Sequence, residues 1–307
     1  MTNIKLPTQH RMQAILLLLG AMAILPLMDA IAKHLSHEMS LWQITWARFT
    51  FHVLWLMPAF LARHRLRELV PARAGLQILR GLCLMASTFL FFGGVAHMPI
   101  ADTLALSFVS PLTVTLLSPF LLGEKVVVRR LSAVGVGLLG ALVIIRPGLG
   151  VFQSAALFGI STGLVYAFYV IITRRLAGTA PALVTLAYTA LLGMIGTSLV
   201  VPFFWVAPSL EQWGLMVALG AIAALGHYLV ILAYERGEAS MLSPFSYAEM
   251  IGAVTVGYLI FGDFPDRWTW LGIAILIGSG VYISIREHRV SPRPPSAAKE
   301  PEEITAG

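Results

Sequence analysis

Residues 239–262, ASMLSPFSYAEMIGAVTVGYLIFG, form an apolar run that is interrupted by one proline and one carboxylate. About 20 predominantly apolar residues are enough to cross a bilayer as a helix. Pro244 removes a backbone donor and frees carbonyl groups that side chains, water or a ligand must satisfy. Glu249 falls near the middle of the run, where a charge costs at least ~2.5 kcal/mol, so such an acid normally faces a cavity or a partner. We therefore expect Ser246, Tyr247 and Glu249 to line the protein interior.

A second interpretation of Glu249 stays open at this point. The carboxylate could lie near a helix end, or a neighbouring helix could neutralise it, and in either case it would be a structural group. The two interpretations differ in whether the acid takes part in function.

Composition assigns the chain to the polytopic membrane proteins. Of its 307 residues 58% are hydrophobic and 12% charged, and the mean hydropathy is +0.82, whereas roughly 25% of a soluble domain is charged. The net charge of +6 does not indicate nucleic acid, because the basic residues fall between apolar runs and not on one basic face. The lipid bilayer is the expected partner. Cys83 is the single cysteine, so no intrachain disulfide or cysteine-based metal site is expected.

Hydropathy predicts an all-α polytopic membrane protein with ten transmembrane helices. The expected spans are 13–33, 40–61, 76–96, 100–122, 130–146, 154–173, 181–205, 212–234, 239–262 and 268–285. Around them we expect a cytoplasmic N-terminal segment at 1–12 and a disordered cytoplasmic tail at 287–307, which is rich in Pro, Ser and charge.

The distribution of basic residues predicts the orientation. With a cytoplasmic N-terminus, sixteen of the 21 Lys and Arg residues fall on the inner side. Only Lys33, Arg146 and Arg267 fall outside, and Arg48 and Arg80 lie within spans. Because cytoplasmic loops carry an excess of Lys and Arg, both termini are expected to be cytoplasmic.

The chain also repeats itself. Residues 121–124, LLGE, end the fourth expected span, and residues 260–263, IFGD, end the ninth, an offset of 139. A glycine-rich stretch follows each of them, at 135–140 and at 272–280. The repeated unit is five spans long, so the two copies, 13–147 and 148–286, enter the membrane in opposite senses. Inverted repeats with a site near the midplane are an architecture of secondary transporters.

Two five-span repeats, an acid-terminated fourth span that begins at Ser110-Pro111, and a glycine-rich fifth span together resemble the drug/metabolite transporter superfamily, and its EamA family in particular. Three stretches, 28–33 (MDAIAK), 46–49 (WARF) and 243–249 (SPFSYAE), are similar to the branch that includes bacterial riboflavin and S-adenosylmethionine uptake carriers. The resemblance implies a carrier of the bacterial inner membrane. In this family the last span of each half lies at a helix interface, so Gly137, Gly140, Gly278 and Gly280 are expected to serve close packing or a homodimer.

Several polar residues within the expected spans are candidates for gating or coupling. Asp29 and Lys33 are four residues apart and can pair on one helix face. With Glu249 they are the gating or coupling candidates. With Arg48 they could form an outer gate or meet an anionic group, and an ion pair that only neutralises itself is an equal alternative. Arg80 is expected to extend toward the cytoplasmic headgroups as a structural group.

The substrate-binding candidates combine polar and aromatic side chains. Aromatic faces in a cavity suit a flat ring by stacking or a cation by its quadrupole, although lipid-facing packing is the alternative for each of them. The candidates are Glu249, Tyr247, Ser246, Trp46, Phe49, Arg48, Phe92, Tyr166 and His227.

The expected function is secondary transport of a small organic metabolite by alternating access, with riboflavin uptake as the first substrate hypothesis. S-adenosylmethionine follows, and then an amino acid or a drug, taken up or exported. No catalytic residue, metal site or cofactor is expected, because the sequence has no P-loop, His-Glu-x-x-His or Gly-x-Ser-x-Gly motif. A membrane-embedded lipid-modifying enzyme and a membrane sensor are the alternatives from other classes.

Overall fold

The computed structural model describes residues 8–63, 73–122, 128–145, 153–176, 179–236, 242 and 245–290. Over this part of the chain the regular elements are helices, with no strand. The first group is α1 (Thr8–Leu35), α2 (Leu41–Leu61), α3 (Ala74–His97), α4 (Ile100–Ser107), α5 (Val109–Leu122) and α6 (Val128–Ile145). The second group is α7 (Gln153–Arg175), α8 (Ala182–Val200), the 3-10 turn η2 (Val201–Phe204), α9 (Leu210–Arg236), α11 (Glu249–Phe261) and α12 (Arg267–Val290).

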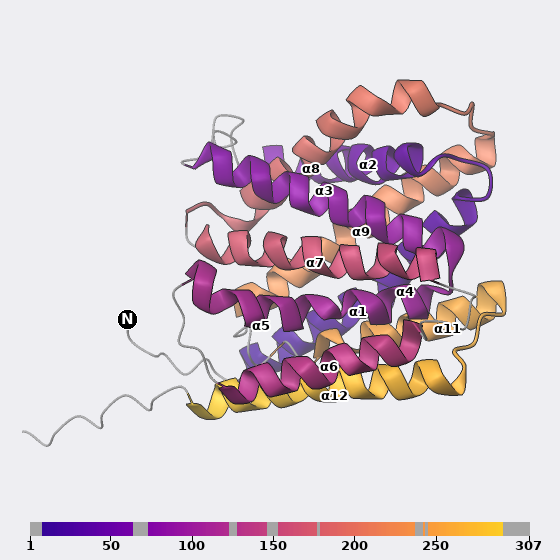
Figure 1. Ribbon diagram of the computed structural model, residues 1–307. Helices are drawn as coiled ribbons and strands as arrows, with labels where there is room; N and C mark the ends of the chain where they lie inside the picture. Colours follow the sequence, from indigo (N-terminus) through magenta and orange to yellow (C-terminus); the bar gives the residue numbers. More distant parts are fainter. Residues whose placement is uncertain are drawn as a thin grey trace, which may run out of the picture.

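The helices run back and forth in one bundle (Figure 1). The start of α1 and the end of α12 lie at the same end of the bundle, and so do the ends of α2, α5, α7 and α9. Within the described part of the chain, five helical segments are long and apolar enough to cross a membrane: Met12–Leu35, Ala74–His97, Ser154–Thr173, Leu183–Phe204 and Leu210–Ala233. Shorter apolar helices cover Ile100–Val114, Gly135–Ile144 and Glu249–Phe261. The chain is therefore an all-helical membrane protein, and the number of ten spans stays a prediction.

Two of the expected spans are interrupted in the structure. The span expected at 100–122 divides at Phe108 into α4 and α5. The span expected at 239–262 divides at Tyr247 and Ala248, and α11 begins at Glu249. Phe108 and Tyr247 are separated by 139 residues, which is the repeat offset in the sequence. The helix therefore breaks at equivalent positions of the two halves, and Ser243 and Pro244 lie outside the described residues.

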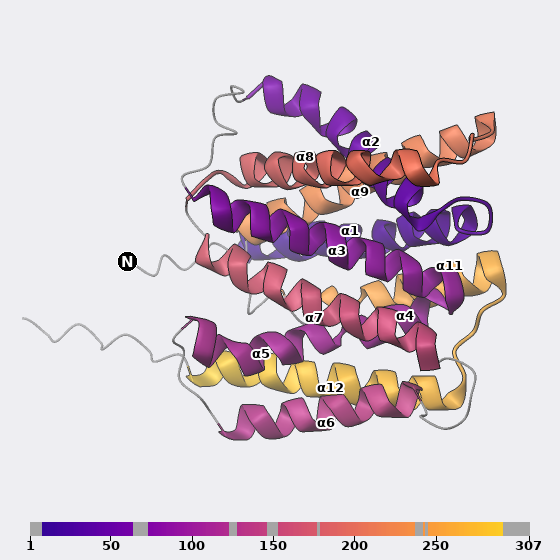
Figure 2. The ribbon, with the colours of Figure 1, turned by 45° about the horizontal axis from the view of Figure 1, so that its top comes forward.

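Two glycine-containing helices pack side by side, α6 and α12, as both ribbon views show (Figure 2). A methyl group on Gly272 would lie 2.7 Å from the carbonyl oxygen of Gly140, and one on Gly137 would lie 2.4 Å from Leu112. Close approach thus requires glycine at these positions. Gly278 does not serve close packing within the chain, because a methyl group there meets nothing within 4 Å. The homodimer stays a prediction.

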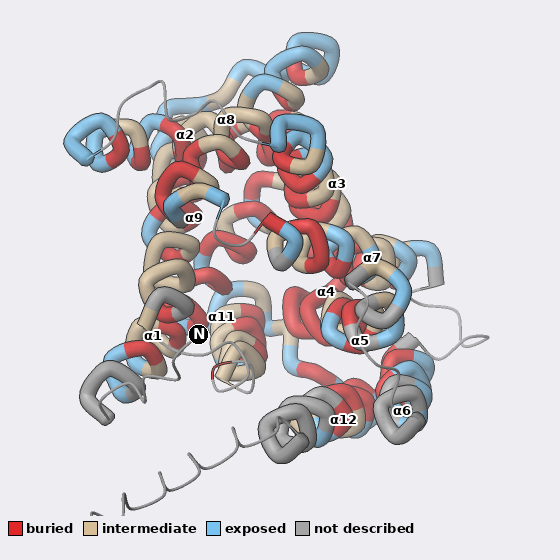
Figure 3. The backbone as a smooth tube through the Cα atoms, turned by 90° about the vertical axis from the view of Figure 1, so that its left-hand side faces the viewer, coloured by how far each residue is buried: buried red, intermediate tan, exposed pale blue. Residues whose placement is uncertain are grey.

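Burial follows the helix faces. Buried residues gather on faces turned toward neighbouring helices, and exposed residues lie on outer faces, as the end-on view shows (Figure 3). Many outer residues are large and apolar, among them Phe120, Leu199 and Tyr258. An apolar outer face is expected for helices that contact lipid tails, and the helices associate mainly by packing and hydrogen bonding. Charged groups inside such a bundle are exceptions to this apolar pattern, and they are therefore candidates for a functional site.

Candidate functional site

A cluster of two buried charged residues and one half-buried glutamate joins the two halves of the chain. Asp29 from α1 and Arg48 from α2 are each 2% exposed, and they interact electrostatically with one another. Asp29 also interacts with Glu249, which lies in the first turn of α11. A buried charge is tolerated only when it is paired or hydrogen-bonded. The cluster therefore places two carboxylates and one guanidinium together, with contributions from both repeats.

Glu249 stands at a helix end. The sequence predicted it near the middle of one continuous span, whereas α11 begins at this residue. Turn hydrogen bonds from Met250 N to Tyr247 O (3.1 Å) and from Ile251 N to Ala248 O (3.0 Å) form the break. The first turn of a helix favours a carboxylate because of the helix dipole. The interpretation that located Glu249 near a helix end thus describes its local geometry, and this end lies within reach of Asp29.

The Arg48 guanidinium is held by His227 of α9. Arg48 Nη2 lies 3.3 Å from His227 Nε2, and His227 Nδ1 lies 2.9 Å from the carbonyl oxygen of Ala223. A carbonyl can only accept, so Nδ1 carries the proton and Nε2 of the neutral ring accepts from Arg48. The Arg48 guanidinium also lies 4.1 Å from the ring centroid of Phe49. These contacts fix Arg48 in the cluster and join α2 to α9.

His52 belongs to the same face of α2 as Arg48, one helical turn later. It is 1% exposed, and its ring centroid lies 6.0 Å from that of His227. Among the described residues neither of its ring nitrogens has a hydrogen-bond partner, and Arg48 Nε has none. Buried polar groups of native proteins usually have partners, so these atoms mark a place where water or a ligand can bind. The i, i+4 spacing of Arg48 and His52 was the signal in the sequence, yet His52 was not among the binding candidates.

The two helix breaks contact one another through their aromatic residues. The rings of Phe108 and Tyr247 lie 5.0 Å apart in an edge-to-face arrangement. Residues that are equivalent in two inverted repeats can touch only near the axis that relates the repeats. This contact therefore locates the pseudo-symmetry axis close to the start of α11 and to Glu249.

The other aromatic candidates do not gather around Glu249. Trp46 Nε1 donates to Ser198 Oγ (3.0 Å), and its ring packs edge-on against Trp205 at 5.4 Å. Phe92 is 1% exposed within the apolar core. Phe49 is fully buried against α8, where a methyl group on Gly193 would lie 2.3 Å from its ring.

Tyr166 is the binding candidate on α7. Its ring is 5.3 Å from that of Tyr169, and both tyrosines lie within electrostatic range of Arg48. Ser246 is half-buried in the turn before α11. Tyr169 was not a binding candidate, and only the fold brings it near Arg48.

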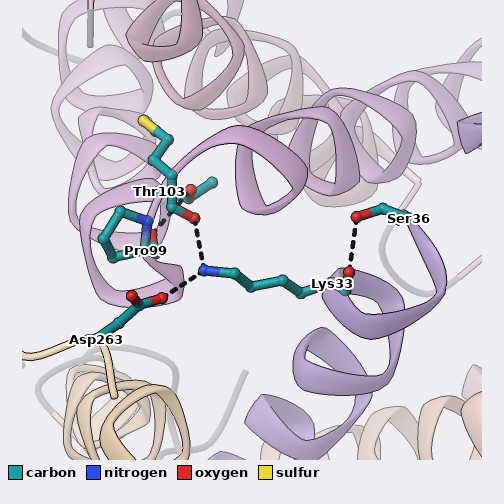
Figure 4. Close-up of polar contacts among 6 residues, drawn as sticks. Lys33, Ser36, Pro99, Thr103 and Asp263 are labelled. Carbon is teal, nitrogen blue, oxygen red and sulfur yellow. Dashed lines mark hydrogen bonds and ion pairs between the residues drawn. The ribbon is translucent and has the colours of Figure 1, made fainter. Parts of the chain in front are cut away.

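Lys33 pairs with Asp263 and not with Asp29. Lys33 Nζ lies 2.5 Å from Asp263 Oδ2 and 3.2 Å from the carbonyl oxygen of Met98, and Figure 4 shows the side chain reaching across between these segments. Gly262 ends α11 with φ of 72°, and Asp263 N donates to Gly257 O (3.1 Å). This left-handed turn favours glycine and aims Asp263 at α1. The contact ties α1 and the start of α4 to the corner between α11 and α12.

Arg80 does not extend to the headgroups as expected. It is 1% exposed, and its Nη2 donates to Thr185 O (2.8 Å) and to Thr189 Oγ1. Both acceptors belong to α8, so the side chain turns into the bundle instead of out of it. A long basic side chain can reach the headgroups only from an outward-facing position, and the packing of α3 against α8 and α7 removes that option.

Known proteins resemble most of the chain. A riboflavin transporter of Brucella anthropi is 30% identical over 234 residues, which cover 73% of this chain and 81% of that protein. An S-adenosylmethionine uptake transporter of Rickettsia conorii is 26% identical over 265 residues, covering 86% and 90%. A solved crystal structure at 22% identity has the same fold, with a TM-score of 0.66 over 90% of this chain and 98% of that one.

The family assignment follows from both halves of the sequence. The profile of the EamA-like transporter family matches residues 12–146 and again residues 153–285. Each match covers one half of the helical bundle, in agreement with a two-repeat architecture. The chain belongs to the EamA-like transporter family.

Proposed function

We propose that this protein takes up riboflavin across the bacterial inner membrane as a secondary carrier that works by alternating access. The observation that carries the proposal is the charged cluster of buried Asp29, buried Arg48 and half-buried Glu249, which receives residues from both halves of a two-repeat transporter. A site shared by two halves changes its access when the halves tilt against one another. A relative named as a riboflavin transporter supports the substrate.

The chemistry of the cluster suits a planar, polar ring. Tyr166 and Tyr169 offer aromatic faces beside Arg48, and Tyr247 stands at the helix break. Aromatic faces stack on flat ligands, and a guanidinium donates to carbonyl oxygens. The isoalloxazine ring of riboflavin presents both a flat surface and two carbonyl oxygens on one edge.

S-adenosylmethionine is the second candidate. Two carboxylates, Asp29 and Glu249, lie near one guanidinium. A sulfonium and an ammonium group could interact with the carboxylates, and the ligand's own carboxylate could interact with Arg48. A relative named as an S-adenosylmethionine uptake transporter supports this alternative.

The orientation remains part of the proposal. The bundle end at which α2, α5, α7 and α9 finish is the one that the charge count assigns to the cytoplasm (Figure 1). Both termini are then cytoplasmic, and the Lys33–Asp263 ion pair lies on the outer side. The described conformation has that outer contact closed.

Growth of a bacterial strain that cannot make riboflavin tests the proposal. Expression of this protein should restore growth on low external riboflavin, and labelled S-adenosylmethionine should be measured in parallel in membrane vesicles. Membrane insertion is verified by immunoblotting. If riboflavin does not restore growth but the vesicles take up S-adenosylmethionine, the second substrate is the correct one. If neither is moved by an inserted protein, both substrate hypotheses are wrong.

The Lys33–Asp263 ion pair is expected to act as the outer gate. Neutralising Lys33 with glutamine should reduce uptake by roughly fivefold, because a partly buried pair contributes about 1 kcal/mol or more to the closed state. The double exchange Lys33→Asp with Asp263→Lys should recover most of the loss. Initial uptake rates at equal membrane abundance measure the effect.

The control for the gate is Arg267→Gln. Arg267 is exposed at the same corner, and its guanidinium lies 5.6 Å from the ring of Trp268. It should leave uptake unchanged. Equal loss in Arg267→Gln and Lys33→Gln, or no recovery in the exchanged pair, would refute the gate.

A further inference from the structure

A second buried arginine lies apart from the Asp29–Arg48–Glu249 cluster. Arg80 is 1% exposed, and within the described residues no carboxylate pairs with it. Its Nη2 is satisfied by two neutral acceptors of α8, Thr185 O and Thr189 Oγ1. An unpaired charge in a protein interior is costly, so a full positive charge held only by neutral oxygens favours an additional acceptor.

Unsatisfied polar atoms accompany Arg80. Arg80 Nε and Gln77 Oε1 are buried, and neither has a hydrogen-bond partner among the described residues. Gln77 is 3% exposed and lies three residues before Arg80, on the same face of α3. The Tyr169 ring centroid lies 5.8 Å from the Arg80 guanidinium carbon. A free donor, a free acceptor and an aromatic face thus share one buried place.

Tyr169 connects this place to the charged cluster. It lies within electrostatic range of Arg48, and its ring lies over the Arg80 guanidinium. Arg80 lies six residues after the start of α3 at Ala74, which is about 9 Å along the helix axis. Arg48 lies thirteen residues before the end of α2 at Leu61, which is about 20 Å. Since these helix ends lie at the same end of the bundle (Figure 1), Arg80 lies nearer to that end.

We propose that Arg80, Gln77 and Tyr169 form a second substrate position, which binds a carboxylate, phosphate or carbonyl group of the substrate between the charged cluster and the predicted cytoplasmic end. The proposal rests on the carrier function proposed above. Arg80 donates from its free Nε to that oxygen, the free Gln77 Oε1 accepts from a neighbouring hydroxyl or N–H group of the substrate, and Tyr169 provides a ring face beside Arg80. A substrate leaving Arg48 then meets a second guanidinium before it reaches the cytoplasm.

The burial of Arg80 favours a ligand that arrives through the bundle. A lipid phosphate offers the same chemistry as a substrate anion, but a headgroup contacts the outer surface, whereas Arg80 is 1% exposed. Phosphate binding measured in lipid-free detergent, with and without added phosphatidylglycerol, distinguishes these two sources.

The transport test compares Arg80→Gln, Arg80→Lys and Arg236→Gln. Glutamine keeps donors for the α8 oxygens and removes the charge, whereas lysine keeps the charge. Arg236 is the matched control, because its Nη1 donates to Leu232 O of its own helix (3.0 Å). Arg80→Gln should lower the maximal uptake rate roughly tenfold or more, with a KM change below about threefold, because only the second position is lost. Arg80→Lys should recover part of the rate, and Arg236→Gln should match wild type.

A binding test does not depend on transport. Inorganic phosphate is titrated against the purified protein in lipid-free detergent, and the apparent Tm is measured. Phosphate should raise the Tm of wild type and Arg236→Gln but not that of Arg80→Gln. Suppression of the phosphate effect by phosphatidylglycerol would assign the position to a lipid headgroup and overturn the proposal.

The outcomes separate the two proposals. If wild type moves neither riboflavin nor S-adenosylmethionine but phosphate stabilises it through Arg80, the substrate assignment fails and the second position stands. If Arg80→Gln transports like wild type, or if its loss only follows a lower Tm without phosphate, Arg80 is a structural link between α3 and α8.

Discussion

Glu249→Gln and Glu249→Ala are both expected to lose riboflavin uptake by at least about tenfold while membrane abundance stays near that of wild type. Glutamine preserves the shape and the hydrogen bonding of the side chain but cannot ionise, and alanine removes both. Because Glu249 faces Asp29 across the two halves, its charge influences the cluster and not the packing of α11. Initial uptake rates and immunoblots of the membrane fraction measure the two effects.

Glu211→Gln is the matched control for this prediction. Glu211 is also a first-turn glutamate, at the start of α9, but it is exposed. It should transport normally. Wild-type uptake by Glu249→Ala at normal abundance would show that the acid has a bystander role, and loss in Glu211→Gln would show that any first-turn acid is needed.

Arg48→Gln is expected to produce the largest combined loss. Leaving a buried charge without its compensating charge typically costs about 3–5 kcal/mol, so both the thermal stability and the uptake should fall, the uptake by more than roughly a hundredfold. The change leaves Asp29 without its cation and His227 Nε2 without its donor. Apparent Tm in detergent and uptake rates at matched abundance are the measurements.

The double variant Arg48→Gln with Asp29→Asn separates stability from function. Removing both charges should restore most of the thermal stability, because no unpaired charge is left, while uptake stays lost. Restored uptake would show that the pair has only a structural role. Wild-type stability and uptake in Arg48→Gln alone would contradict the cluster itself.

Glycine and acid residues in the sequence predicted part of the fold directly. The repeated LLGE and IFGD stretches gave the repeat offset of 139, and the structure breaks a helix at Phe108 and Tyr247 with that same spacing. Local chemistry explains why the IFGD stretch ends a helix, because Gly262 permits the left-handed turn that ends α11. Composition likewise identified a membrane protein, since apolar content is a property of the chain and not of its arrangement.

The partners of the charged residues could not be predicted in the same way. Spacing by four residues suggested Asp29 with Lys33, yet Lys33 crosses to Asp263, which is 230 residues away in the sequence. Helical periodicity states which side chains share a face, and it does not state which helix lies opposite. A long side chain can form its ion pair or hydrogen bond with any neighbouring helix. Tertiary packing therefore selected the partner.

The sequence by itself determined the membrane class, the two-repeat organisation and the presence of acids and arginines within apolar segments. Only the tertiary structure decided that Glu249 begins a helix beside Asp29, that Arg48 meets His227, and that Arg80 turns inward to α8. The physical reason is that hydrophobicity and turn propensity act over a few residues, whereas a buried charge needs partners wherever the fold brings them. In this protein those partners come from both halves of the chain.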